Sequence, residues 1–205
     1  MTTCANELIN DLIHSKALYS DNIIEAFRNV DRADFVLNKN DSTIYGDFPL
    51  SIGYQQTISQ PTTVAMMLEM LEPRMGDKIL DIGSGSGWTT ALLAYMVGTK
   101  GSVLGLERVN ELVKFGSNNL KKYEIKNAKI IKSSNKLGIP TEKFDRILVS
   151  ASADEFPNDL LKQLKIGGKL VVPVRNSIYE VEKISNENFN LFEHKGFSFV
   201  PLITI

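Results

Sequence analysis

The chain has 205 residues, of which 43% are hydrophobic and 23% charged, which is enough to bury the core of about one globular domain. Its formal net charge is −1, so no basic excess draws it onto nucleic-acid phosphates or an anionic membrane, and we expect neither partner. The single cysteine, Cys4, excludes an internal disulfide and a cysteine-rich zinc site, and no metal is expected. The N-terminal residues lack a basic and apolar signal sequence, and the longest purely apolar run, Ala91 to Val97, is far shorter than a membrane span. A cytoplasmic protein is therefore expected.

The first part of the chain differs in character from the rest. Amphipathic periodicity predicts helices over 5–14 and 20–30, after which a polar, non-periodic loop over 51–61 leads into a helix over 62–71. We expect one domain over residues 1–205, with an N-terminal helical extension and active-site loop over 1–60 and an α/β core over 61–205.

Strand-like and helix-like segments alternate in the core. Strands are predicted over 79–82, 102–107, 128–132, 144–150 and 168–174, with helices over 88–97, 109–123 and 157–164. This alternation predicts a parallel, doubly wound sheet that binds its ligand at the carboxyl ends of the strands. Two further runs, 179–185 and 189–195, are joined by too short a link for parallel pairing and should form an antiparallel hairpin at the sheet edge.

Three glycines at alternate positions, Gly83, Gly85 and Gly87, follow the first core strand. Glycine lets the backbone turn sharply and lets a bound molecule approach main-chain atoms. The spacing does not fit the dinucleotide pattern Gly-x-Gly-x-x-Gly, since Trp88 stands where its third glycine would be. A phosphate-binding loop does not fit either, because it must end in Gly-Lys-Ser/Thr, whereas here Gly87 is followed by Trp88 and Thr89.

The stretch resembles the first motif of S-adenosylmethionine-dependent methyltransferases of the Rossmann-like class, in which an acid, here Asp81, precedes Gly-x-Gly-x-Gly. The next predicted strand ends at Glu107, 24 residues after Gly83. An α/β nucleotide site places the acceptor for its ribose hydroxyls near this distance. The alternative is an ordinary strand-to-helix turn.

The sequence also narrows the chemical class of the group that accepts the methyl. Methylation of adenine amines commonly uses Asn/Asp-Pro-Pro-aromatic after the fourth core strand, where this chain has Ser-Ala-Ser-Ala from Ser150, and cytosine C5 chemistry needs a thiolate in the core. The acids Asp154 and Glu155 are too few to predict a Mg²⁺-dependent site. A carboxylate acceptor is already ionised at neutral pH and needs orientation more than a base. Thr57 and Ser59 are suitable hydroxyl donors for it.

The loop from Ile52 to Pro61, Ile-Gly-Tyr-Gln-Gln-Thr-Ile-Ser-Gln-Pro, resembles the signature loop of protein-L-isoaspartate(D-aspartate) O-methyltransferases, usually Ile-Gly-x-Gly-Gln-Thr-Ile-Ser-x-Pro. The resemblance continues through 80–87, 144–151, 160–174 and the closing Phe-Val-Pro-Leu at 199–202, and so covers roughly residues 20 to 202. It implies a Rossmann-like class I fold with a seven-stranded, mostly parallel sheet and an antiparallel C-terminal edge hairpin. In this family the last two strands are exchanged relative to most methyltransferases.

The resemblance implies methyl transfer from S-adenosyl-L-methionine to the free α-carboxyl of L-isoaspartyl residues in damaged proteins or peptides. The ester then collapses to a succinimide, which reopens partly as normal aspartate. A monomer is expected. Ser59 would be the active-site hydroxyl, and the substrate site would comprise Gln56, Thr57, Ile58, Val200, Pro201 and Leu202. The cofactor site would comprise Asp81, Gly83, Ser84, Gly85, Glu107, Arg108, Ser134 and Asn135, with Asp81 and the glycine backbone at the methionine part and Glu107 at the ribose.

The chain departs from the family pattern at three places. Gln55 replaces the second loop glycine, Ser133-Ser134-Asn135 replaces the usual Gly-Asp-Gly whose acid accepts from the adenine amino group, and Ile203 replaces a polar residue shortly before the chain ends. A neutral acceptor at 134 or 135 is expected to weaken cofactor binding by about 1 kcal/mol without abolishing it. Two alternatives therefore stay open: a related O-methyltransferase that acts on another carboxylate or hydroxyl, and a catalytically silent peptide-binding relative.

Overall fold

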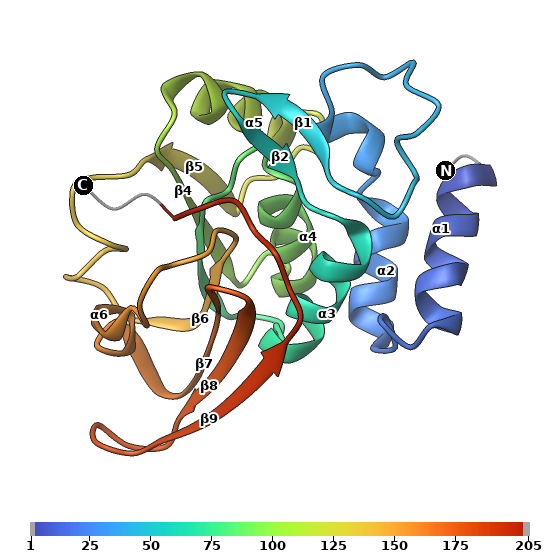
Figure 1. The fold of residues 1–205 in the computed structure, drawn as a ribbon. Coiled ribbons are helices and arrows are strands. Elements are labelled where there is room, and N and C mark those ends of the chain that lie inside the picture. The colour runs from blue at the N-terminus through green and yellow to red at the C-terminus, as the bar shows by residue number, and fades with distance from the viewer. Residues whose placement is uncertain (1–2, 203–205) are drawn as a thin grey trace.

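The central feature of the protein is a seven-stranded, mostly parallel sheet (Figure 1). The structure is a computed structural model and describes residues 3–202. The strands are β3 (Lys78–Ile82), β4 (Ser102–Glu107), β5 (Ala128–Lys132), β6 (Phe144–Val149), β7 (Leu164–Val174), β8 (Ser177–Lys183) and β9 (Phe189–Lys195), in the spatial order β5-β4-β3-β6-β7-β8-β9. The first five pair in parallel, whereas β8 and β9 are antiparallel to their neighbours. The predicted fold class and edge hairpin are confirmed. The last two strands lie in the sheet in the order in which they occur in the chain, with β8 next to β7 and β9 at the edge.

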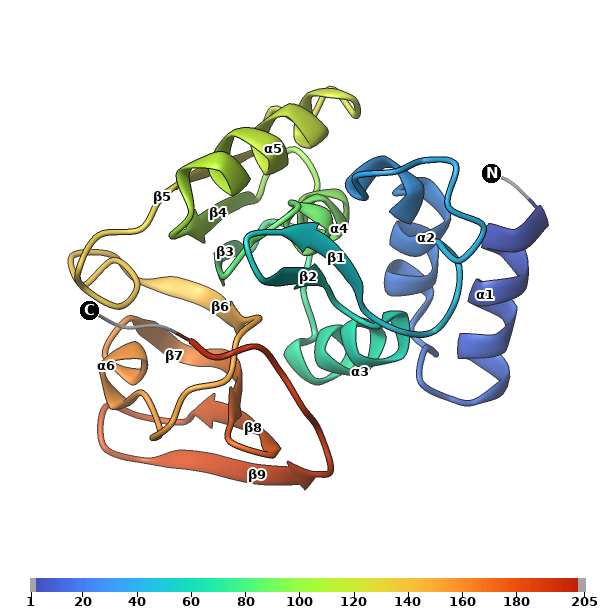
Figure 2. The same ribbon diagram turned by 45° about the horizontal axis from the view of Figure 1, so that its top comes forward.

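The helices cover the two faces of the sheet unequally. They are α1 (Thr3–His14), α2 (Asp21–Asn29), the 3₁₀ helix η1 (Arg32–Phe35), α3 (Pro61–Leu71), α4 (Trp88–Val97), α5 (Asn110–Lys121) and α6 (Asn158–Leu161). One face is covered by α3, α4 and α5, and α2 packs outside α4 (Figure 2). The other face carries the single-turn α6 and loop residues. Alternation along β3 explains the two cores, since Ile79 joins the first cluster and Leu80 and Ile82 the second.

A short antiparallel hairpin, β1 (Leu50–Gly53) and β2 (Gln56–Ile58), occupies the region predicted to be a polar loop. Its two central residues, Tyr54 and Gln55, both have left-handed backbones, with φ of 54° and 57°. This conformation matches the twist of a two-residue hairpin turn. Neither residue type signals such a turn, and strands of three and four residues are too short to show periodicity, which explains why the sequence did not predict them.

The segment around residues 157–174 also differs from the prediction. The expected helix over 157–164 is reduced to α6, and β7 begins at Leu164, four residues before the predicted start. Leu164 already pairs with Phe144 of β6, and a register shift follows before the pairs resume at Arg146. Gly167, with a φ of 78°, lies within this irregular stretch. The helix therefore ends at Leu161, and the longer strand takes over the last residue of the predicted helix, Leu164.

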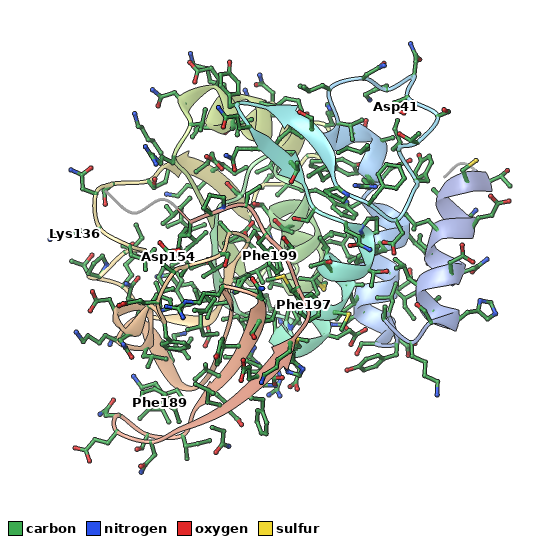
Figure 3. The ribbon with its side chains drawn as sticks, in the orientation of Figure 1. Asp41, Lys136, Asp154, Phe189, Phe197 and Phe199 are labelled. Atoms are coloured by element: carbon green, nitrogen blue, oxygen red, sulfur yellow. The ribbon has the colours of Figure 1, made fainter. Side chains whose placement is uncertain are left out.

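After β9 the chain returns over the carboxyl end of β6 (Figures 1 and 2). The Ser152 N–H donates to the Val200 carbonyl at 2.8 Å, and the Leu202 N–H donates to the Ser152 carbonyl at 2.7 Å. Phe197 and Phe199 lie on this segment, and their ring centroids are 6.5 Å apart (Figure 3). The returning segment thereby becomes one wall of the region described next.

Candidate active site

A cavity of about 710 Å³ opens at the carboxyl ends of β3, β4 and β6. It lies within the usual size range of small-molecule sites. The hairpin β1–β2 and residues 200–202 form its walls. The predicted site residues that line it together are Gln56, Thr57, Ile58, Ser59, Gly83, Ser84, Gly85, Glu107, Arg108, Ser134, Asn135, Val200, Pro201 and Leu202. Asp81 is the one predicted site residue that does not line it. Ile203 lies outside the described residues.

The turn after β3 brings backbone to the cavity surface. Gly85 has a φ of 49°, and a Cβ placed there would lie 3.3 Å from the Ile52 Cδ1 of the hairpin. The adjacent Ser84 hydroxyl is buried and has no hydrogen-bond partner within residues 3–202. A close backbone approach and an unpartnered hydroxyl provide contacts for a polar ligand.

The carboxylate of Glu107 organises the turn through backbone N–H groups. Its Oε2 accepts from the Gly85 N–H at 2.9 Å, and its Oε1 accepts from the N–H groups of Arg108 at 2.7 Å and Val109 at 2.8 Å. Glu107 is buried, and it is the one carboxylate residue in the described cavity lining. Because each carboxylate oxygen has two lone pairs, Oε2 retains capacity to accept from a ligand hydroxyl.

Asp81 is fully buried behind the cavity. Its Oδ2 accepts from the hydroxyls of Thr90 at 2.6 Å and Thr89 at 3.0 Å. Its Oδ1 has no partner in the part of the chain that is described. Burial raises the pKa of Asp81 to about 6, the two threonine hydroxyls oppose this shift, and Glu107 adds to it. Thr89 lines the cavity, so Asp81 orients a hydroxyl at the ligand surface.

Ser59 stands between β2 and the first turn of α3. Asp47 caps this helix by accepting from the Thr62 N–H at 2.8 Å and the Thr62 hydroxyl at 2.7 Å. The Ser59 carbonyl accepts from the buried guanidinium of Arg32 at 3.2 Å. Ser59 is half-buried, and its backbone is held between β2, α3 and the buried guanidinium of Arg32.

The far end of the cavity is formed by the loop after β5. The Ser134 hydroxyl accepts from the Lys136 N–H at 3.2 Å, and Ser134 and Asn135 are both exposed. They offer neutral oxygen acceptors where the resemblance leads one to expect a carboxylate. The donor and acceptor groups around the cavity fit S-adenosylmethionine, with a carboxylate for the ribose hydroxyls and a glycine turn for the amino-acid part.

None of the helices within residues 3–202 combines the length and apolar character that a membrane crossing requires. Over the same residues, no three His, Cys, Asp or Glu side chains are grouped so that they could hold a metal ion.

Comparison with known proteins agrees with this geometry. The sequence model of the protein-L-isoaspartate(D-aspartate) O-methyltransferase family matches residues 3–204. The chain belongs to this family. It is 42% identical to the protein-L-isoaspartate O-methyltransferase of Methanopyrus kandleri over 191 residues, which cover 90% of this chain and 84% of the relative. It is 39% identical to the Pyrococcus horikoshii enzyme over 190 residues, which cover 90% and 86%.

A solved structure extends the comparison to the fold and the methyl donor. The protein-L-isoaspartate O-methyltransferase of Plasmodium falciparum, in complex with S-adenosyl-L-homocysteine, superposes with a TM-score of 0.87 at 29% identity. The match covers 97% of this chain and 98% of that one. Family membership and this S-adenosyl-L-homocysteine complex together indicate S-adenosyl-L-methionine as the methyl donor.

Several residues of the site were not predicted from the sequence. Thr89 and Thr90 lie in the first turn of α4, eight and nine residues after Asp81, and this separation gives no local signal of their contact with it. Tyr54 lines the cavity from the hairpin tip, and Arg32 reaches the site from η1. Neither carried a local signal, because their roles depend on contacts made by the folded hairpin region.

Proposed function

We propose that this protein transfers a methyl group from S-adenosyl-L-methionine to the free carboxylate of L-isoaspartyl residues in proteins or peptides, with Ser59 as the active-site hydroxyl. One observation carries the proposal: the Gln56–Ser59 segment and the glycine turn at Gly83–Gly85 line the same cavity. A carboxylate-orienting segment and a nucleoside-binding turn therefore face each other across a space large enough for both ligands.

The cofactor end is assigned to residues of the central strands. When bound, S-adenosylmethionine supplies an electrophilic sulfonium methyl group. Glu107 would accept from the ribose hydroxyls, while Ser134 and Asn135 would serve the adenine. The backbone from Gly83 to Gly85, the unpartnered Ser84 hydroxyl and the buried Asp81 would hold the amino-acid part, and Arg108 would border the ribose. Three backbone N–H groups donate hydrogen bonds to Glu107 and keep its carboxylate in place before any ligand binds.

The acceptor end is assigned to the hairpin and the returning C-terminal segment. An isoaspartyl carboxylate is ionised at neutral pH, so the protein needs no base to activate it. The hydroxyls of Ser59 and Thr57 would donate to this carboxylate and orient one oxygen, without the strong neutralisation that a lysine or arginine would bring. Gln56 and Ile58 would complete the pocket, and residues 200–202 would contact the substrate backbone.

The methyl ester leads to repair by chemistry of the product itself. The backbone nitrogen that follows the ester attacks its carbonyl carbon, loses its proton and expels methanol, which leaves a succinimide. Water then opens the succinimide partly to normal aspartate. We also infer that residues 1–205 act as a single domain, as a monomer in the cytoplasm, without nucleic-acid or membrane partners. The net charge of −1 supports the absence of polyanionic partners.

The test uses a pair of peptides that differ only in an isoaspartyl or an aspartyl linkage. We expect methyl ester on the isoaspartyl peptide alone. Ser59→Ala should lower kcat/KM by about 10- to 100-fold while S-adenosylhomocysteine affinity is retained. Ser51→Ala is the matched control, since Ser51 lies on β1 outside the cavity lining. Turnover of another carboxylate with none of the isoaspartyl peptide would assign a different acceptor, and binding without any turnover would leave a silent relative.

A further inference from the structure

A buried guanidinium, that of Arg32, lies behind the hairpin wall of the cavity. Arg32 is 3% exposed and donates four hydrogen bonds, all of them to backbone carbonyls. Its Nη1 donates to Ile44 at 2.6 Å and Gly46 at 2.9 Å. Its Nη2 donates to Phe48 at 2.9 Å and to Ser59 at 3.2 Å. One planar group thus gathers the whole segment that leads into and out of the hairpin.

The same guanidinium also contacts the cofactor side of the cavity. It lies over the ring of Trp88, 5.6 Å from the centroid, and Trp88 lines the cavity at the start of α4. Phe27 packs edge-on against that ring from α2, with centroids 5.5 Å apart. Arg32 therefore joins the segment that contains Ser59 to the helix that follows the glycine turn.

The arrangement depends on the shape of arginine. Burial lowers the pKa of Arg32 to about 10, with Asp47 opposing the shift, so the group stays cationic at neutral pH. A guanidinium presents its N–H donors in a fixed fork, whereas a lysine ammonium is a single point with three rotatable donors. Lysine can hold some of these carbonyls but cannot reproduce four contacts and a stacked ring at once. Loss of the fork should leave Ser59 free to shift.

We propose that Arg32 is a positioning residue for methyl transfer: through the Ser59 carbonyl it fixes the hydroxyl of Ser59 against the acceptor, and through Trp88 it fixes this wall relative to the cofactor turn. The inference rests on the proposed function of Ser59. Arg32 lies behind the cavity and contacts no reactant, so it acts only through the groups that it holds.

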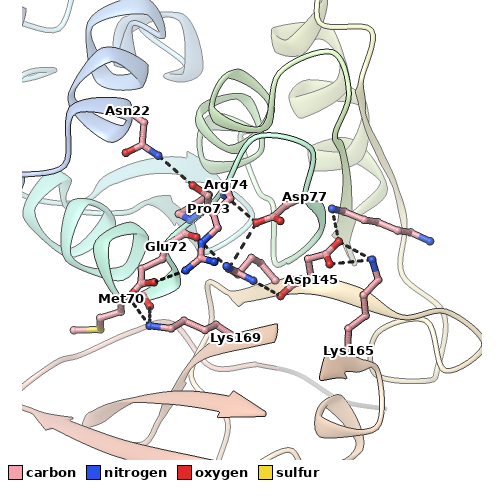
Figure 4. A network of polar contacts seen from close by, with 11 residues as sticks. Asn22, Met70, Glu72, Pro73, Arg74, Asp77, Asp145, Lys165 and Lys169 are labelled. Carbon is pink, nitrogen blue, oxygen red and sulfur yellow. Dashed lines mark hydrogen bonds and ion pairs between the residues drawn. The ribbon is translucent and has the colours of Figure 1, made fainter. Parts of the chain in front are cut away.

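Arg146 provides a matched control elsewhere in the chain. It is also buried, at 4% exposure, and donates to the carbonyls of Glu72 at 3.1 Å and Asp145 at 2.9 Å. Its Nε lies 3.7 Å from a carboxylate oxygen of Asp77. Figure 4 shows Glu72, Asp77 and Asp145 in this network, which also includes Lys169 and lies outside the cavity lining. Arg146→Lys thus removes the same fork without touching the site.

The experiment compares wild type with Arg32→Lys, Arg32→Gln and Arg146→Lys. For each protein, kcat and KM on the isoaspartyl peptide, S-adenosylhomocysteine affinity and Tm are measured well below the unfolding temperature. We expect all three variants to lose some Tm. Only the Arg32 variants should lose kcat, by about 10- to 100-fold, because a displacement of about 1 Å at a reacting group has an effect of this size. Their S-adenosylhomocysteine affinity should stay within about threefold, and Arg32→Lys should retain more activity than Arg32→Gln.

Chemical rescue provides a second readout that a purely structural role would not move. In Arg32→Ala, millimolar guanidinium should restore part of kcat, while the same concentration should leave Arg146→Ala unchanged. The inference is overturned if the Arg32 variants keep wild-type kcat, if Arg146→Lys loses as much, or if cofactor affinity falls in parallel with kcat. A wild-type protein that does not methylate the isoaspartyl peptide refutes the proposed function and the inference together. Wild-type activity that is insensitive to Arg32 refutes the inference alone.

Discussion

Asp81 should make the stability of the ligand-free protein depend on pH in a direction unusual for a carboxylate. Its pKa is raised from an ordinary 3.8 to about 6, chiefly because the side chain is fully buried. At about 1.4 kcal/mol for each pH unit, the difference corresponds to about 3 kcal/mol. The folded state holds the proton more tightly than the unfolded state, so this contribution is fully present below about pH 4. It is lost as pH rises through about 6.

Asp81→Asn removes the titration and keeps the shape and one acceptor oxygen for the threonine hydroxyls. The free energy of unfolding of the variant, minus that of wild type, should therefore rise by about 2.5 kcal/mol between pH 4 and pH 7.5. The measurement is urea unfolding of the ligand-free proteins at four pH values across this range, with the m-values compared at each pH. Equal m-values show that stability, and not the compactness of the unfolded chain, has changed.

Asp145→Asn is the control, because its shift has the opposite sign. Burial raises the pKa of Asp145, but the side-chain hydrogen bond from Lys165 and the backbone hydrogen bond from Lys78 outweigh it and lower the pKa. Stability from Asp145 is thus present above its unfolded pKa and lost as pH falls. The two variants should diverge in opposite directions from wild type. Parallel pH profiles for wild type and Asp81→Asn would refute the assignment of a buried, high-pKa carboxylate behind the glycine turn.

Three other substitutions test the cavity. Ser134→Asp should tighten S-adenosylhomocysteine binding about fivefold by calorimetry, which corresponds to about 1 kcal/mol for a charge-assisted hydrogen bond; unchanged affinity would mean that this loop does not serve the adenine. Glu107→Gln leaves a backbone N–H group, such as that of Gly85, without an acceptor. It should therefore lower the free energy of unfolding by about 2 kcal/mol and weaken S-adenosylhomocysteine binding at least tenfold. Gln55→Gly should raise stability by roughly 0.5 kcal/mol because Gln55 has a left-handed backbone, whereas Gln56→Gly should lower it; equal losses would argue against turn strain.

Much of the fold follows from local patterns in the sequence. The strand, glycine turn and helix from Lys78 to Val97 were predictable because an apolar run, alternate glycines and a second apolar run each specify one local structure. The hairpin β1–β2 was not predictable, since its strands are short and its turn residues, Tyr54 and Gln55, are held left-handed by the packed structure around them. The start of β7 was missed for a related reason. Pairing with Phe144, a long-range contact, decides that Leu164 is in a strand.

The residues of the site also fall into a predictable and an unpredictable group. Motif residues such as Gly85 and Glu107 converge because parallel strands end at one edge of the sheet, so their proximity follows once the strand order is known. Positions that support them could not be predicted from spacing. Thr90 reads as an ordinary polar residue of a helix until the structure places its hydroxyl 2.6 Å from Asp81. Arg32 lies 27 residues before Ser59, whose carbonyl it binds, and no pattern in the intervening sequence predicts this contact.

Together these supports explain how two unlike walls are held at a fixed separation. On the cofactor side, the buried Glu107 accepts from backbone N–H groups and so fixes the glycine turn. On the acceptor side, the buried Arg32 donates to backbone carbonyls and so fixes the hairpin segment and Ser59. Both charged groups make their hydrogen bonds to main-chain groups and not to an oppositely charged side chain, which orients the backbone while leaving the cavity side chains free to meet a ligand. Methyl transfer to an already ionised carboxylate needs this preorganisation more than it needs proton transfer, because the distance and alignment between the two reacting groups set its rate.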